Sequence, residues 1–201
     1  EELFYAIDVD QQQGFWVSPD ARVGTWIGKF MGDSAGAANM SRIMPGYDRE
    51  VRIKDSALPQ FKAATLKIEG DQTNEGMREI RMHLQSAGRG EYINLLFAAD
   101  AGILTATVNG FPLNVPETAE NGHGGLQLPS SENWWRWHWY GLPEEGAEIV
   151  LTLPAGRPVP VRIVEVDYRL PGGAPMRPEN SIRKPYTWSD GTVIFQTVML
   201  E

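Results

Sequence analysis

Short runs of β-type sequence, separated by turn residues, recur along most of this 201-residue chain. Connecting short strands takes many turns, and the 21 glycines and 14 prolines are the residue types that turns favour. The dipeptide Asn109-Gly110 between two apolar runs is the strongest hairpin signal in the sequence. The pattern therefore predicts a mainly β, antiparallel β-sandwich-like domain. The expected strands are 49–54, 63–69, 78–86, 92–98, 104–108, 134–140, 148–153, 159–168 and 192–200.

The first part of the chain predicts a β-hairpin followed by one short amphipathic helix near the N-terminus. Residues 3–9 and 14–18 are two short β-like runs, and we expect Gly14 to relieve backbone strain at the turn between them. Apolar residues then recur at the spacing of one helical face until Gly32, after which 33–47 reads as a loop. The helical stripe consists of Val23, Trp26, Ile27, Phe30 and Met31.

The organisation of the chain favours a single β-rich accessory domain over residues 1–201, because no repeat or low-complexity linker divides it. The sequence enters its first strand at once, and we expect the domain to be cut from a longer protein. The net charge of −8 and the lack of a basic run argue against a nucleic-acid partner. The chain has no apolar stretch of about 18 residues, so we expect no membrane span in this segment.

The sequence offers no complete catalytic or metal-binding pattern. Cysteine is absent, which removes thiolate ligands and nucleophiles, and His83, His123 and His138 are not at metal-ligand spacing. The stretch 32–36 (GDSAG) matches the G-x-S-x-G nucleophile elbow, but it follows a helix instead of preceding one. The acidic pair in 8–10 faintly matches a calcium loop and is more simply read as turn capping. We expect no catalytic residue, no metal and no cofactor in this domain.

The run Trp134–Tyr140 (WWRWHWY) contains four of the seven tryptophans. Each such ring carries about 150–250 Å² of mostly apolar surface, which is costly to leave in water. Side chains alternate between the two faces of a strand, so Trp135, Trp137 and Trp139 share one face. We expect that face to lie in the core. The other face mixes aromatic and polar groups and is the predicted binding surface, consisting of Trp134, Arg136, His138 and Tyr140.

Two other roles for this run remain open. One face of the strand can form a flat platform on which sugar rings stack, as in carbohydrate-binding modules, with Arg136 and His138 supplying hydrogen bonds. The run can also make an aromatic contact with a neighbouring domain or with the membrane interface, where Trp and Tyr are enriched.

Both ends of the chain resemble one family. They are similar to the C-terminal extracytoplasmic domain of bacterial membrane-anchored di-zinc aminopeptidases, a group related to the vacuolar membrane protease and the endoplasmic reticulum metallopeptidase. The middle of the chain is only loosely similar. The matching segments are 5–10 (YAIDVD), 14–18 (GFWVS), Asp20, 25–30 (TWIGKF), Arg177-Pro178 and 185–193 (PYTWSDGTV).

The resemblance implies a non-catalytic accessory domain. In that family a peptidase domain with two zinc ions comes first, transmembrane helices follow, and a β-rich domain closes the chain. None of the family's zinc ligands or its catalytic acid has a counterpart here. The resemblance also implies that this domain lies on the extracytoplasmic (periplasmic) side of a bacterial membrane. Its partners would be the peptidase and transmembrane portions of the same protein. It would pack on the peptidase domain or regulate access to it.

Overall fold

The computed structural model describes residues 2–20, 24–88, 91–115, 134–172, 188 and 190–201. The chain divides into two compact units, each described here by itself. Unit 1 comprises Glu1–Ala63 and Val164–Gln196, and unit 2 comprises Ala64–Ile163 and Thr197–Glu201. The expectation of a single domain stays a prediction. Among the described residues, no helix combines the length and apolarity that crossing a bilayer requires.

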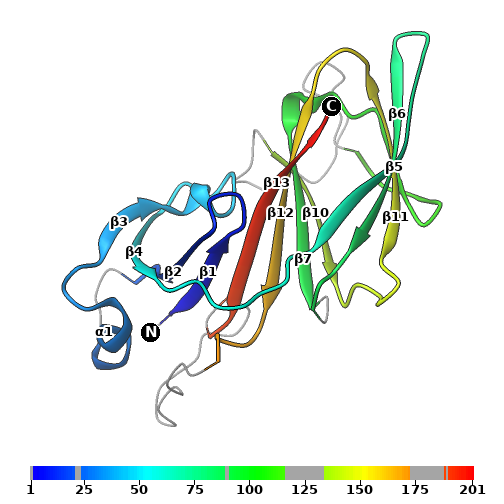
Figure 1. Ribbon diagram of the computed structural model, residues 1–201. Helices are drawn as coiled ribbons and strands as arrows, with labels where there is room; N and C mark the ends of the chain where they lie inside the picture. Colours follow the sequence, from blue (N-terminus) through cyan, green and yellow to red (C-terminus); the bar gives the residue numbers. More distant parts are fainter. Residues whose placement is uncertain (1, 21–23, 89–90, 116–133, 173–187, 189) are drawn as a thin grey trace. The chain divides into compact units, whose positions relative to one another are not determined.

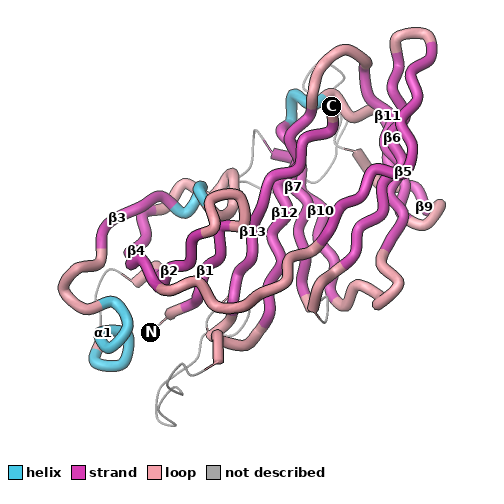
Figure 2. Tube along the Cα trace, viewed as in Figure 1, coloured by secondary structure: helices cyan, strands magenta, loops and turns pink. Residues whose placement is uncertain are grey.

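The prediction of a mainly β fold with one short helix is confirmed (Figure 2). Three of the expected strands, including Trp134–Tyr140, begin and end at the expected residues. The strands are β1 Phe4–Asp8, β2 Gln13–Ser18, β3 Gly36–Asn39, β4 Glu50–Ser56, β5 Thr65–Asn74, β6 Met77–Gln85, β7 Tyr92–Ala98, β8 Thr105–Val108, β9 Phe111–Pro112, β10 Trp134–Tyr140, β11 Ala147–Pro154, β12 Val159–Asp167 and β13 Thr192–Leu200. The helices are α1 Thr25–Met31 and the 3-10 turns η1 Met40–Arg42 and η2 Ala99–Ala101.

Unit 1 is built on a sheet in which β13, β1, β2, β4 and β3 are neighbours in that order (Figure 1). The expected N-terminal hairpin is present, since β1 and β2 pair antiparallel. On its other side β1 pairs parallel with β13, and Tyr5 lies opposite Thr192. The two ends of the sequence therefore form one sheet. No local sequence pattern predicts this pairing, because it joins residues almost 190 positions apart.

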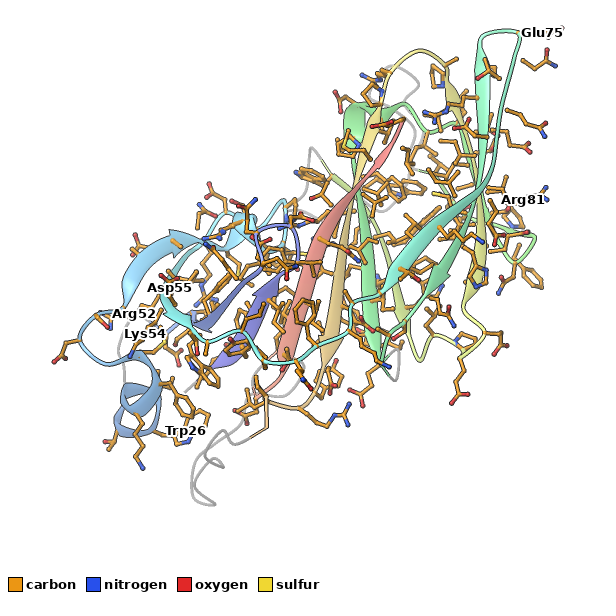
Figure 3. The ribbon with its side chains drawn as sticks, in the orientation of Figure 1. Trp26, Arg52, Lys54, Asp55, Glu75 and Arg81 are labelled. Carbon is orange, nitrogen blue, oxygen red and sulfur yellow. The ribbon has the colours of Figure 1, made fainter. Side chains whose placement is uncertain are left out.

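Helix α1 buries the predicted apolar stripe. Trp26, Ile27, Phe30 and Met31 are buried with Leu3, and Trp16 of β2 packs against them (Figure 3 labels Trp26). The ring centroids of Trp16 and Phe30 are 4.5 Å apart. The helix ends at Gly32, whose positive φ of 54° suits a residue without a Cβ. The helix begins at Thr25, and Gly24 caps it without a side-chain hydrogen bond. Val23, the first residue of the predicted stripe, lies outside the described residues.

Gly14 has a different role from the predicted one. It lies inside β2, not in the turn, and it is buried. A Cβ at Gly14 would lie well inside contact distance of the Tyr5 hydroxyl, so the Tyr5 ring occupies the space of the missing side chain. The Tyr5 hydroxyl donates a 2.7 Å hydrogen bond to the carbonyl of Ala57. Burial raises the pKa of the Tyr5 phenol.

The expectation of a loop over 33–47 is wrong in part. Residues 36–39 form the edge strand β3, in which Ala37 pairs with Arg52 of β4, and η1 follows directly. Asn39 caps η1 by accepting a 2.8 Å hydrogen bond from the Ser41 amide. Glycine and alanine have low strand propensity, so residues 36–39 form a strand because they pair with β4 and not because of their own sequence.

Unit 2 is a sandwich-like pair of sheet layers around one core. One layer has the strand order β5-β6-β11-β8-β9, and the other contains β10, β7 and β12. Alternate residues of β6 and β11 point into this core, as the burial patterns of both strands show. The β7 and β12 side chains meet them there, and the fully buried members include Ile80, Met82, Leu95, Phe97, Leu151 and Val161.

Two turns in unit 2 use positive backbone φ angles. Asn109 and Gly110 connect β8 to β9 with φ of 49° and 79°, which confirms the predicted hairpin. Glu75 and Gly76 connect β5 to β6 in the same way, and Glu75 lies at the tip of this hairpin (Figure 3). Gly70 follows the expected strand 63–69 directly and lies within β5 at a register shift. A glycine inside a strand often marks such a bulge.

Replacing Gly14 tests the packing of Tyr5 in unit 1. The substitution Gly14→Ala should destabilise the chain by about 1–3 kcal/mol, because the new methyl group overpacks the buried Tyr5 ring. Gly36→Ala is the control, since its nearest neighbour would lie 4.0 Å from the Cβ. Thermal unfolding followed by circular dichroism measures both. Equal melting temperatures for the two variants would contradict the assigned role of Gly14.

Candidate binding surface on strand β10

Strand β10 lies at one end of its sheet and pairs antiparallel with β7 along its whole length. The register is continuous over seven pairs, from Trp134 opposite Ala98 to Tyr140 opposite Tyr92. This pairing decides which β10 side chains face the core, because Phe97, Leu95 and Ile93 of β7 are core residues.

The inner face of β10 carries the three tryptophans predicted to face the core. Trp137 is 8% exposed and belongs to the core cluster, while Trp135 and Trp139 are half-buried and pack against it. The ring centroids of Trp135 and Trp137 lie 4.3 Å apart at 64°, and those of Trp137 and Trp139 lie 6.1 Å apart at 70°. These edge-to-face contacts are the arrangement that aromatic pairs favour. The prediction for this face is confirmed.

The outer face holds the predicted binding residues, and the structure brings them together in one row. Trp134 and Arg136 are half-buried, whereas His138 is exposed and Tyr140 is 71% exposed. The ring centroids of His138 and Tyr140 are 5.7 Å apart. Whether this row binds anything stays a prediction.

One residue of β7, Tyr92, extends this surface, and the sequence reasoning missed it. The Tyr92 ring lies 4.8 Å from that of Tyr140 at a tilt of 32°, and 6.2 Å from the ring of His138. The Tyr92 hydroxyl donates a 2.9 Å hydrogen bond to Oδ1 of the fully buried Asn94. Only the register between β7 and β10 brings these residues together, so no signal in either run alone identifies them.

The backbone of β10 has two different sides. The Gly141 amide donates a 3.2 Å hydrogen bond to the Glu91 carbonyl, and these two residues continue the β10–β7 register. In an antiparallel pair, hydrogen-bonded and non-hydrogen-bonded residue pairs alternate. The amides and carbonyls of Trp135, Trp137 and Trp139 therefore point towards β7. Those of Trp134, Arg136, His138 and Tyr140 point towards the other edge, where no strand of the described chain pairs.

The remaining candidate sites receive no support from their surroundings. Ser34 lies exposed in a turn after α1, without the strand-turn-helix geometry of a nucleophile elbow. Asp8 accepts a 3.0 Å hydrogen bond from the Gln11 amide, the turn capping that we expected. The ring of His83 bonds the Glu145 carbonyl, and His123 lies outside the described residues. Within the described ranges, no three His, Asp or Glu side chains converge as a metal site would require.

Comparisons with known proteins do not identify a family. Neither a protein-family model nor a curated protein matches the sequence. The β10 surface is therefore interpreted from its own chemistry. Its aromatic rings can stack against a flat partner, and its imidazole, guanidinium and outward backbone groups can form hydrogen bonds.

Truncation to alanine should lower the stability of the chain much more on the inner face of β10 than on its outer face. Trp137→Ala should destabilise the chain by about 3–5 kcal/mol, because it empties a core position. Tyr140→Ala should change stability by about 0.5 kcal/mol or less, as surface substitutions commonly do. Urea unfolding of the two variants measures the difference. Similar losses in both would show that Tyr140 is structural and not a surface residue.

Proposed function

We propose that this chain is a non-catalytic extracytoplasmic accessory domain of a membrane-bound zinc metallopeptidase. The resemblance of both ends of the sequence to that family motivates the proposal. The observation that supports it is the pairing of β1 with β13 in unit 1. The opening segment and the closing Thr192-Val193 of the resemblance are adjacent strands, as expected if they were inherited as one structural element. Residues 177–178 and 185–187 of the closing segment lie outside the described residues.

The domain would act by binding, with the outer face of β10 as its contact surface. Tyr140, His138 and Tyr92 form an aromatic group there, on a strand whose inner face Trp137 fixes in the core. A rigid aromatic surface loses little conformational entropy when it is covered, and Tyr and Trp are enriched among residues that dominate interfaces. The partner would be the peptidase portion of the same protein. By packing on it, the domain would limit access to the zinc site.

The test of this proposal compares two exposed aromatic residues. Tyr140 and Phe111 are 71% and 74% exposed, but Phe111 lies in β9 of the other layer. In the full-length protein, Tyr140→Ala should change aminopeptidase activity or weaken binding of this chain to a separately expressed peptidase portion. Phe111→Ala should leave both unchanged. No aminopeptidase activity in the full-length protein, or no effect of Tyr140→Ala on either measurement, would refute the proposal.

A carbohydrate-binding module is the second candidate. The exposed Tyr140 ring, tilted by 32° to that of Tyr92, favours it, because sugar rings stack on aromatic faces. A platform made by Trp137 is not compatible with the burial of that ring. Titration of the chain with a panel of oligosaccharides tests this candidate. Binding that Tyr140→Ala abolishes, at an unchanged melting temperature, would support a sugar site in place of a protein contact.

A further inference from the structure

Arg78 is a buried cation in unit 2 that connects two distant parts of the chain. Its Nε and Nη2 atoms donate hydrogen bonds of 2.9 and 2.5 Å to the two carboxylate oxygens of Asp71 in β5. Its Nη1 atom donates a 3.2 Å hydrogen bond to the carbonyl of Leu200, the last residue of β13. The Leu200 side chain is fully buried in the core of unit 2. Arg78 therefore joins the β5–β6 hairpin to the end of the last strand.

The register shift in β5 brings Asp71 to this guanidinium. The shift follows Ile68, and beyond it Asp71 lies opposite the core residue Ile80. If the pairing continued without the shift, Asp71 would lie opposite Glu79 on the other face of the sheet, because strand side chains alternate with a period of two. Bulges recur in sheets as a means of re-aiming one side chain. This bulge supplies the buried Arg78 with its counter-ion.

The end of β13 is held differently from the rest of the strand. In unit 1, β13 pairs with β1 as far as Phe195. Residues 197–200 belong to unit 2, and β12 is their sheet neighbour among the described strands. A strand end with one neighbouring strand separates from its sheet more easily than a strand held on both sides. Two further contacts hold this end in place, the Leu200 side chain in the core and the hydrogen bond from Arg78.

We propose that residues 197–200, the C-terminal strap, open locally while the rest of unit 2 stays folded, and that the Asp71–Arg78 pair is the latch that keeps the strap closed. In the open state the Leu200 side chain leaves the core and uncovers apolar surface, and water reaches the guanidinium. The Asp71 side chain is 34% exposed, so its carboxylate is already partly hydrated in the closed state.

The carboxylate of Asp71 decides the balance between the two states. With Asp71 in place, the buried guanidinium has a bidentate counter-ion while the strap is closed. Without it, the closed state would hold an unpaired buried charge, which is costly, whereas the open state would hydrate that charge. Asp71 is therefore a positioning residue that acts on the strap through Arg78. The proposal concerns the chain itself and does not depend on the metallopeptidase proposal.

Thiol labelling can measure the opening, because the chain contains no cysteine that would react as background. Leu200→Cys places a thiol on the strap, and Leu151→Cys places one in the same core on β11. Both positions are fully buried, so iodoacetamide reacts only with the opened chain. Position 200 should react at least about tenfold faster than position 151, with a weaker dependence on low urea concentrations. Val198→Cys offers a second thiol on the strap if Leu200→Cys does not fold.

Two substitutions added to the strap cysteine test the latch. Asp71→Asn should raise the labelling rate at position 200 about tenfold or more, because the closed state then lacks its counter-ion. Glu79→Gln is the matched control, since it removes an exposed carboxylate from the residue beside Arg78 and should change the rate by less than about twofold. Circular dichroism checks the folding of each variant, and mass spectrometry measures the labelling.

Two results would overturn the proposal. Equal rates and equal urea dependence at the strap cysteine and at position 151 would show that the strap opens only when the whole of unit 2 unfolds. An Asp71→Asn rate no higher than that of Glu79→Gln would show that the pair is not a latch. Both results leave the metallopeptidase proposal untouched, because Tyr140→Ala tests it separately in the full-length protein.

Discussion

The antiparallel pairing of β10 with β7 is the interaction on which the account of unit 2 depends. It places Trp137 in the core, sets His138 and Tyr140 on the outer face, and directs half of the strand's backbone groups away from β7. A shift of one residue would turn all of these side chains to the opposite face, because strand side chains alternate with a period of two. The inward tryptophans make such a shift costly, since it would expose aromatic surface and bury Arg136 and His138 in their place.

Much of the fold could be predicted from the sequence because its strands are locally marked. Trp134–Tyr140 and Tyr92–Ala98 are apolar runs with clear boundaries, and Asn109-Gly110 has the turn chemistry that a hairpin needs. The helix could be predicted for the same reason, since its apolar residues repeat at one spacing. These are short-range signals, and each can be read without knowing what the segment packs against.

The features that could not be predicted are those set by distant partners. The parallel pairing of β1 with β13 joins the two ends of the chain, and β3 forms only because β4 offers it an edge. Gly14 is required by the Tyr5 ring across the strand pair and not by a turn. The candidate surface was likewise predictable only where it depends on residues close together in the sequence. Its β10 residues could be predicted by alternation, whereas Tyr92 joins it only through the register between two strands.

The central claim is that the β10–β7 register points the backbone groups of Trp135, Trp137 and Trp139 towards β7 and those of His138 and Tyr140 away from it. Hydrogen exchange resolved to single amides tests this most directly. The account predicts slow exchange for the amides of Trp135, Trp137 and Trp139, which bond to β7, and fast exchange for those of His138 and Tyr140. Equally slow exchange along the whole strand, or slow exchange at His138 and Tyr140 alone, would contradict it.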